Sequence, residues 1–96
     1  MKIDVNENKK RAELYLKEKV FVFLREFSPD RDVRFYNGFI TKINTDSIMF
    51  FDIELKREFP VYLDRFVIDV SAKKDITQEI AREIMWEFYK KEGVGK

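Results

Sequence analysis

Carboxylates are the only side chains in this sequence from which a metal site or a catalytic acid–base pair could be built. The 96 residues include no Cys and no His, which removes thiolate ligands and nucleophiles, imidazole ligands and the usual general base near neutral pH. The candidate carboxylates are Asp46, Asp52, Glu54, Asp64 and Asp69. No fixed spacing links them, and strand alternation places charged side chains on a solvent face. We therefore expect no enzyme, no catalytic residue, no metal site and no cofactor.

Nucleic-acid binding is the other chemistry to consider. Lys and Arg number 19 against 18 Asp and Glu, and residues 20–70 hold seven basic and nine acidic residues. Counterion release needs clustered cations, and the longest basic run, Lys9-Lys10-Arg11, lies before that zone. The adjacent aromatic residues at 35–36 and 50–51 could stack unpaired bases. The interpretation that we favour places one ring of each pair in a core and the other under a helix or a subunit.

Two sequence zones predict the elements that would position these side chains. Residues 1–19 favour a short helix over 6–18, with Asn6 or Asn8 as its cap. Residues 20–70 are rich in β-branched and aromatic residues that are interrupted by turn residues, which is typical of short strands. The predicted strands cover 19–27, 33–44, 48–53, 58–63 and 66–70.

The third zone, residues 71–96, holds the most regular apolar pattern. Apolar side chains recur every four residues and predict an amphipathic helix over 75–91. Asp75 is the expected cap, with Gln78 completing a capping box. With 45% apolar and 16% aromatic residues, the chain is no disordered segment, and its length suits a single domain over 1–96.

Gly38 and Pro60 shape the predicted sheet. A glycine inside a strand marks a bulge or a sharp bend, and Gly38 is too isolated to form a phosphate-binding loop. Proline cannot donate to a ladder, so Pro60 should lie at an edge or a bulge. Five short strands with a bend in the second favour a small closed barrel, which removes exposed edges. The expected fold class is mainly β with flanking helices.

Two short motifs accompany these strands. The first runs from Gly38 through Ile40 and Ile43 to Asn44, and the second is Leu-Asp-Arg at 63–65, just before the fifth strand. In these motifs and in its strand order the chain resembles the Sm-like (LSm) family of RNA-associated ring proteins. The family has Asp at the end of the first motif and Ile-Arg-Gly in the second. The C-terminal helix is an addition to the commonest family pattern.

This resemblance implies a five-stranded Sm-like barrel of SH3 type that binds RNA at its two motif loops. The nucleic-acid-binding positions that it implies are Asn44 and Asp46 in one loop, and Asp64 and Arg65 in the other. Arg65 would contact a phosphate or a base edge, and Asn44 would hydrogen-bond a base. The loop at 44–47 is shorter than in family members that bind uridine-rich RNA.

Surplus apolar surface favours self-assembly. Residues 20–24 and 48–51 are apolar on both faces, and Trp86 and Tyr89 lie off the main stripe of the C-terminal helix. Pairing the fourth strand of one subunit with the fifth of the next would bury this surface in a cyclic homo-oligomer. We expect a non-enzymatic oligomeric binding module whose partner is single-stranded RNA. The alternative is a structural or protein–protein interaction subunit with no nucleic-acid role.

The first residues and the longest apolar run bear on location. Residues 1–13 lack the apolar stretch of a signal peptide, and the run at 20–24 is far shorter than the roughly 20 residues that span a bilayer. We expect a cytoplasmic protein with no membrane partner.

Overall fold

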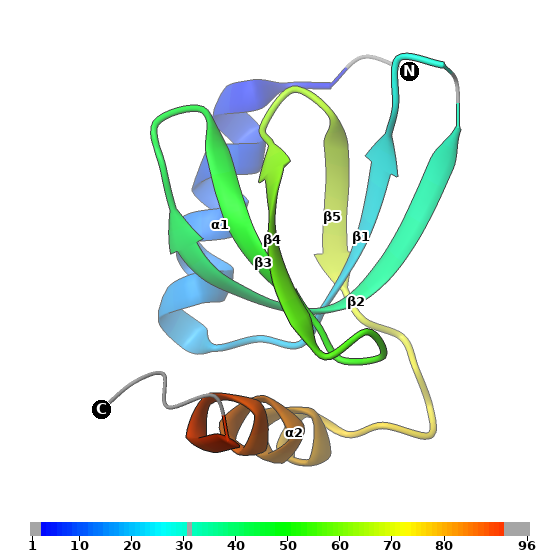
Figure 1. Ribbon diagram of the computed structural model, residues 1–96. Helices are drawn as coiled ribbons and strands as arrows, with labels where there is room; N and C mark the ends of the chain where they lie inside the picture. Colours follow the sequence, from blue (N-terminus) through cyan, green and yellow to red (C-terminus); the bar gives the residue numbers. More distant parts are fainter. Residues whose placement is uncertain (1–2, 31, 92–96) are drawn as a thin grey trace.

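The computed structural model, shown in Figure 1, describes residues 3–30 and 32–91 as an α+β fold. An N-terminal helix precedes five antiparallel strands, and a C-terminal helix follows them, an order consistent with Sm-like topology. The elements are α1 (Val5–Glu18), β1 (Val22–Phe27), β2 (Val33–Ile43), β3 (Ser47–Asp52), β4 (Arg57–Tyr62), β5 (Phe66–Val70) and α2 (Gln78–Lys91).

The strands form one sheet in the order β4-β3-β2-β1-β5. All five predicted strands are present, and the largest difference is at β1, which begins at Val22 instead of residue 19. Within the described part of the chain no ladder joins β4 to β5, so closure of the sheet into a barrel stays a prediction. No helix among the described residues is long and apolar enough to cross a membrane.

Gly38 lies in β2 opposite Asp52 of β3, where the two backbones approach closely. A Cβ atom placed on Gly38 would lie 1.7 Å from the carbonyl oxygen of Phe51, so β3 leaves no room for a side chain there. The bulge is elsewhere, at Thr41, where the register between β2 and β3 shifts. Close backbone approach therefore explains the glycine, and the irregularity in the ladder falls three residues later.

Two apolar clusters lie on the two faces of the sheet. Phe50 belongs to the cluster on the α1 side and Phe51 to the cluster under α2, because side chains alternate along β3. The first cluster contains Ala12, Val22, Leu24, Ile40, Ile48, Phe50, Val61, Leu63, Phe66 and Ile68. The second contains Phe21, Phe39, Phe51, Ile53, Ala81 and Met85.

The predicted split of the adjacent aromatic pairs is therefore confirmed at 50–51 and only half confirmed at 35–36. Tyr36 packs against the first cluster, with its ring centroid 4.9 Å from that of Phe59. Phe35 is 62% exposed and stacks on Phe23, with the two ring centroids 5.9 Å apart. Among the described residues, no helix buries Phe35, so this half of the interpretation would need a subunit.

The cap predicted for α1 was wrong. Asp4 is the N-cap, and its carboxylate accepts a hydrogen bond from the Glu7 N–H at 3.1 Å. Asn6 lies inside the helix, as does Asn8, which is buried. Asp4 is the cap because it directly precedes the first helical residue. From that position a side-chain oxygen can reach the backbone N–H of the residue three places later in the chain.

The capping box predicted for α2 was also wrong. The helix begins at Gln78, and the hydroxyl of Thr77 accepts from the Ile80 N–H at 3.2 Å. Gln78 points to the sheet instead, where its amide accepts from the Phe21 N–H at 2.6 Å and donates to the Phe21 carbonyl at 3.3 Å. This pair of bonds positions the start of α2 beside the chain that enters β1.

Both outer edges of the sheet are protected. Pro60 lies in β4, the strand at one end of the order, as predicted for an edge. At the other end, the ladder alternation turns the carbonyls of Phe66 and Ile68 away from β1. These carbonyls accept hydrogen bonds from Asn8 and Arg11 of α1. Helix α1 thus covers the β5 edge with polar side chains.

Candidate nucleic-acid interface

The structure brings the two predicted loops together. The Leu63 N–H donates to the Asp46 carbonyl at 3.0 Å, which extends the β3–β4 ladder by one pair and joins the β2–β3 loop to the β4–β5 loop. The first loop carries Asn44 and Asp46, and the second carries Asp64 and Arg65. All four predicted positions therefore lie on one end of the sheet, although the two loops are far apart in the sequence.

Arg65 presents its guanidinium on an aromatic ring. The Cζ atom lies 5.5 Å from the ring centroid of Tyr62, at a distance that suits a cation–π contact. The Nε atom lies 4.0 Å from the nearest carboxylate oxygen of Asp64, and the side chains of both residues are substantially exposed. Exposed pairs of this kind contribute little to stability. The guanidinium is therefore available to a ligand, with a flat ring beside it.

Asn44 has two roles at the turn. Its N–H donates to the Ser47 carbonyl at 2.8 Å, and its amide donates to the Ser47 hydroxyl at 3.3 Å. The carbonyl oxygen of the side chain remains an acceptor. Asn44 and Thr45 also line a shallow hollow of about 410 Å³ together with Lys9 of α1. Lys9 was not among the binding positions predicted from the sequence, because only the fold places α1 beside this loop.

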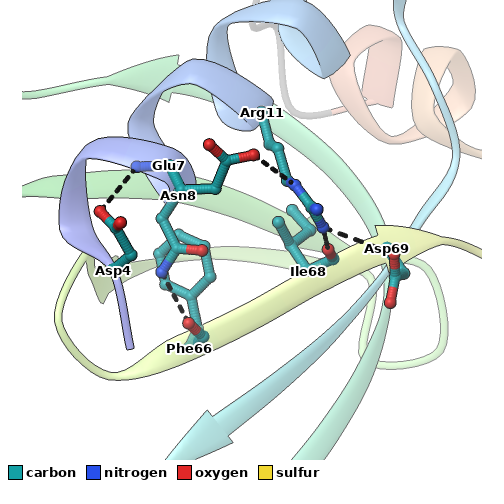
Figure 2. Close-up of polar contacts among 7 residues, drawn as sticks. All are labelled: Asp4, Glu7, Asn8, Arg11, Phe66, Ile68 and Asp69. Carbon is teal, nitrogen blue, oxygen red and sulfur yellow. Dashed lines mark hydrogen bonds and ion pairs between the residues drawn. The ribbon is translucent and has the colours of Figure 1, made fainter. Parts of the chain in front are cut away.

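Asn8 fixes the second loop. Its amide donates to the Leu63 carbonyl at 2.9 Å and to the Phe66 carbonyl at 2.6 Å, so it spans the segment that holds Asp64 and Arg65. Figure 2 shows the bond to Phe66 beneath the first turns of α1. The signal that sequence reasoning missed is the position of Asn8 one turn before the fully buried Ala12, on the same helix face.

Arg11 holds the next part of β5. Its guanidinium donates to the Ile68 carbonyl at 3.3 Å and lies 3.7 Å from a carboxylate oxygen of Asp69 (Figure 2). A second carboxylate, that of Glu7, lies 3.2 Å from its Nε atom. Arg11 therefore orients β5, and its charge is already neutralised by neighbours, so we do not assign it to the ligand.

The candidate carboxylates do not converge. Among the described residues, no group of three or more acidic side chains lies close enough to hold a metal ion. Asp52 is buried and accepts from the Asn37 N–H at 3.2 Å and the Leu55 N–H at 2.7 Å, which shapes the turn after β3. Glu54 lies 2.6 Å from the Lys73 ammonium. These two carboxylates have structural partners, and Asp46 and Asp64 are exposed in the loops.

Charge at the paired loops is balanced, since Arg65 and Lys9 are offset by Asp46 and Asp64. Such a surface offers hydrogen bonding and stacking more than phosphate attraction. Comparison with models of known families, with curated proteins and with solved structures finds no match for this chain, so the interface is interpreted from its own residues.

Proposed function

We propose that the protein is a non-enzymatic Sm-like binding module that takes single-stranded RNA at the paired β2–β3 and β4–β5 loops. The observation that carries the proposal is the hydrogen bond between Leu63 and Asp46, which sets Asn44 and Arg65 on one surface. The barrel itself is part of this proposal. The strand order and the very short β4–β5 connection support it, because that connection leaves β5 close to the end of β4.

Each loop residue would make a contact that suits its chemistry. Arg65 would bind a phosphate or a base edge, and the Tyr62 ring beneath it would limit the positions that the guanidinium can take. Asn44 would accept a hydrogen bond from a base. Lys9 would add a second cation on the other side of the turn. Asp46 and Asp64 would restrict the path of the phosphates by repulsion.

Fluorescence anisotropy with a labelled single-stranded RNA tests the proposal. Two or three phosphate contacts predict that affinity falls roughly tenfold between about 50 and 200 mM salt. Arg65→Ala and Asn44→Ala should each weaken binding in a protein that still folds. The matched control is Arg57→Ala, which removes an exposed arginine at the other end of β4. Unchanged affinity in both loop variants would refute the RNA interface.

A cyclic homo-oligomer completes the proposal, and the β5 edge sets its condition. Pairing β4 with the β5 of a neighbour would use the carbonyls of Phe66 and Ile68, which α1 now occupies. Ring formation would therefore displace Asn8 and Arg11. Light scattering on a sizing column decides this point: about five to seven subunits would support the ring. A single monomeric species would refute the ring, and the α1 contacts would then serve only to protect the β5 edge.

A second candidate function is a protein-interaction subunit without a nucleic-acid role. Phe35 favours it, because an apolar ring that is 62% exposed and pre-stacked on Phe23 suits a protein partner. The RNA titration separates the two candidates. Salt-sensitive binding that depends on Arg65 would exclude this second function, and the absence of any RNA binding would favour it.

A further inference from the structure

A groove of about 640 Å³ lies between the end of α1, the β2–β3 hairpin and α2. Its size falls within the usual range for sites that hold a small molecule or a single nucleotide. Apolar side chains from three elements form its walls: Leu16 from α1, Met49 from β3, and Met85 and Trp86 from α2. The groove is distinct from the hollow at Lys9, but it reaches the same loop.

Trp86 is the dominant feature of this groove. It is the only tryptophan in the chain, and it remains 60% exposed even though α2 buries Ala81 and Met85 against the sheet. Its position off the main apolar stripe of the helix predicted that another surface would cover it. An exposed indole in a concave site provides a flat face for stacking, and such stacking with a base is sequence-tolerant.

One end of the groove is polar. The hydroxyls of Thr41 and Tyr89 both donate to Oε2 of the Glu58 carboxylate, and the bond from Tyr89 is 3.3 Å long. Burial and the charge of Glu58 raise the pKa of Tyr89 to about 12, so the phenol keeps its proton at neutral pH. Among the described side chains, no hydrogen bond is donated to the other oxygen, Oε1, so Glu58 retains a free acceptor at the groove that it lines.

Two cations complete the lining. Lys19 ends α1 in a left-handed backbone conformation, with φ of 53°, and Lys42 lies in β2. Within the described residues, neither ammonium group has an ion-pair partner. Asn44 also lines the groove, which makes it continuous with the proposed RNA-binding loops.

We propose that this groove binds an unpaired, amino-bearing base of a single-stranded nucleic acid that continues from the loops. Trp86 stacks on the base, Glu58 accepts a hydrogen bond from its amino group, and Lys19 and Lys42 contact the flanking phosphates. The inference rests on the proposed function, since the strand reaches the groove past Asn44. An apolar peptide fits less well, because it would bury two ammonium groups and a carboxylate without partners.

The carboxylate predicts which bases are preferred. Cytosine and adenine each have an amino group that can donate a hydrogen bond to a carboxylate. Uracil has a carbonyl oxygen at the corresponding position, and this oxygen can only accept. The groove should therefore favour oligo(C) and oligo(A) over oligo(U), by roughly tenfold for a hydrogen bond to a charged group. Glu58→Gln should reduce this preference, because an amide both donates and accepts.

Tryptophan fluorescence tests the groove directly, since Trp86 is its only source. Titration of the full chain with oligo(C), oligo(A) and oligo(U) should quench this fluorescence at lower concentrations of the first two. By anisotropy with a labelled oligomer, Trp86→Ala should weaken binding at least roughly fivefold, while Trp86→Phe should keep most of it. Lys42→Gln should weaken binding, and the control Lys17→Gln, on the exposed face of α1, should not.

The readouts separate failure of the groove from failure of the loops. If Arg65→Ala abolishes RNA binding and no oligomer quenches Trp86, base binding in the groove is refuted. The proposed RNA binding at the loops would still be supported. If Arg65→Ala leaves the quenching of Trp86 unchanged, the result would support base binding in the groove and refute RNA binding at the loops. Equal quenching by all three oligomers would refute the selection by Glu58, and no binding in either assay would refute both sites.

Discussion

The two helices hold to the sheet in different ways. Helix α1 packs Ala12 into the first cluster and adds polar bonds, since Asn8 and Arg11 donate to backbone carbonyls of β5 and its preceding loop. Helix α2 packs mainly through apolar side chains: the centroid of Phe51 lies 4.7 Å from that of Phe88 and 6.1 Å from that of Tyr89. Its polar bonds to the sheet are those of Gln78 at its start. Hydrogen bonds are directional, so the bonds from Asn8 can set the position of a loop.

This difference matches the two sites. The interface beside α1 depends on where a short loop lies, and Asn8 fixes that loop at two carbonyls. The groove beside α2 depends on an exposed indole and a cavity, which apolar packing provides. The helices are also joined directly, because Arg82 of α2 donates to the Lys19 carbonyl at 3.0 Å and to the Glu18 carbonyl at 3.3 Å, at the C-terminus of α1.

The largest expected effect on stability comes from truncating a buried phenylalanine in either apolar cluster. Phe50 and Phe51 are adjacent and fully buried, but they face α1 and α2 respectively. Substitution of either by Ala should lower the free energy of unfolding by about 3–5 kcal/mol, measured by urea titration. Phe51→Ala should raise amide hydrogen exchange in α2 more than Phe50→Ala does, because only Phe51 packs on that helix. Unchanged exchange there would contradict the view that rings hold α2 in place.

A smaller effect should follow loss of the polar attachment of α1. Asn8→Ala leaves the Leu63 and Phe66 carbonyls without their side-chain donor, which should cost about 1–3 kcal/mol. Asn6→Ala is the matched control, because Asn6 is exposed on the same helix and should change stability by no more than about 0.5 kcal/mol. Equal effects of the two variants would show that helix propensity, not the bond to the loop, is what matters.

The smallest expected effect is the change of stability with pH that arises from Tyr89 in α2. The pKa of Tyr89 is raised from 10.0 to about 12 by burial and by the charge of Glu58. Below pH 10 both the folded and the unfolded states keep the phenol proton, and this contribution to stability is complete. Between pH 10 and 12 the unfolded state loses the proton first, so stability should fall as pH rises. Tyr89→Phe should remove this part of the decline in urea titrations; an identical decline would contradict it.

Much of the fold could be predicted because its signals are local. The strands are visible as runs of β-branched and aromatic residues between turns, and β5 has the predicted boundaries, 66–70. Pro60 indicated an edge strand correctly, since a missing N–H excludes a central position. The helix caps were less predictable. Several polar residues stand near each helix start, and Gln78 bonds across the sheet instead of within its own turn.

The candidate sites were only partly predictable. The resemblance supplied four loop positions, but no local signal connects Lys9 or Asn8 with them, because these residues come from a helix more than 30 positions earlier. The groove was invisible for the same reason. Its residues come from α1, β2, β3, β4 and α2, and the helical pattern indicated only that Trp86 needed another surface.

The sequence by itself determined which elements form, since periodicity, turn residues and the constraints on glycine and proline act between near neighbours. It also excluded His and Cys chemistry outright. Only the tertiary structure decided that α1 closes the β5 edge, that the two loops share a hydrogen bond, and that Trp86 stays exposed beside Glu58 and Lys42. These are contacts between segments that are distant in the sequence, and they depend on the path of the whole chain because directional bonds and close packing need both partners brought to within contact distance.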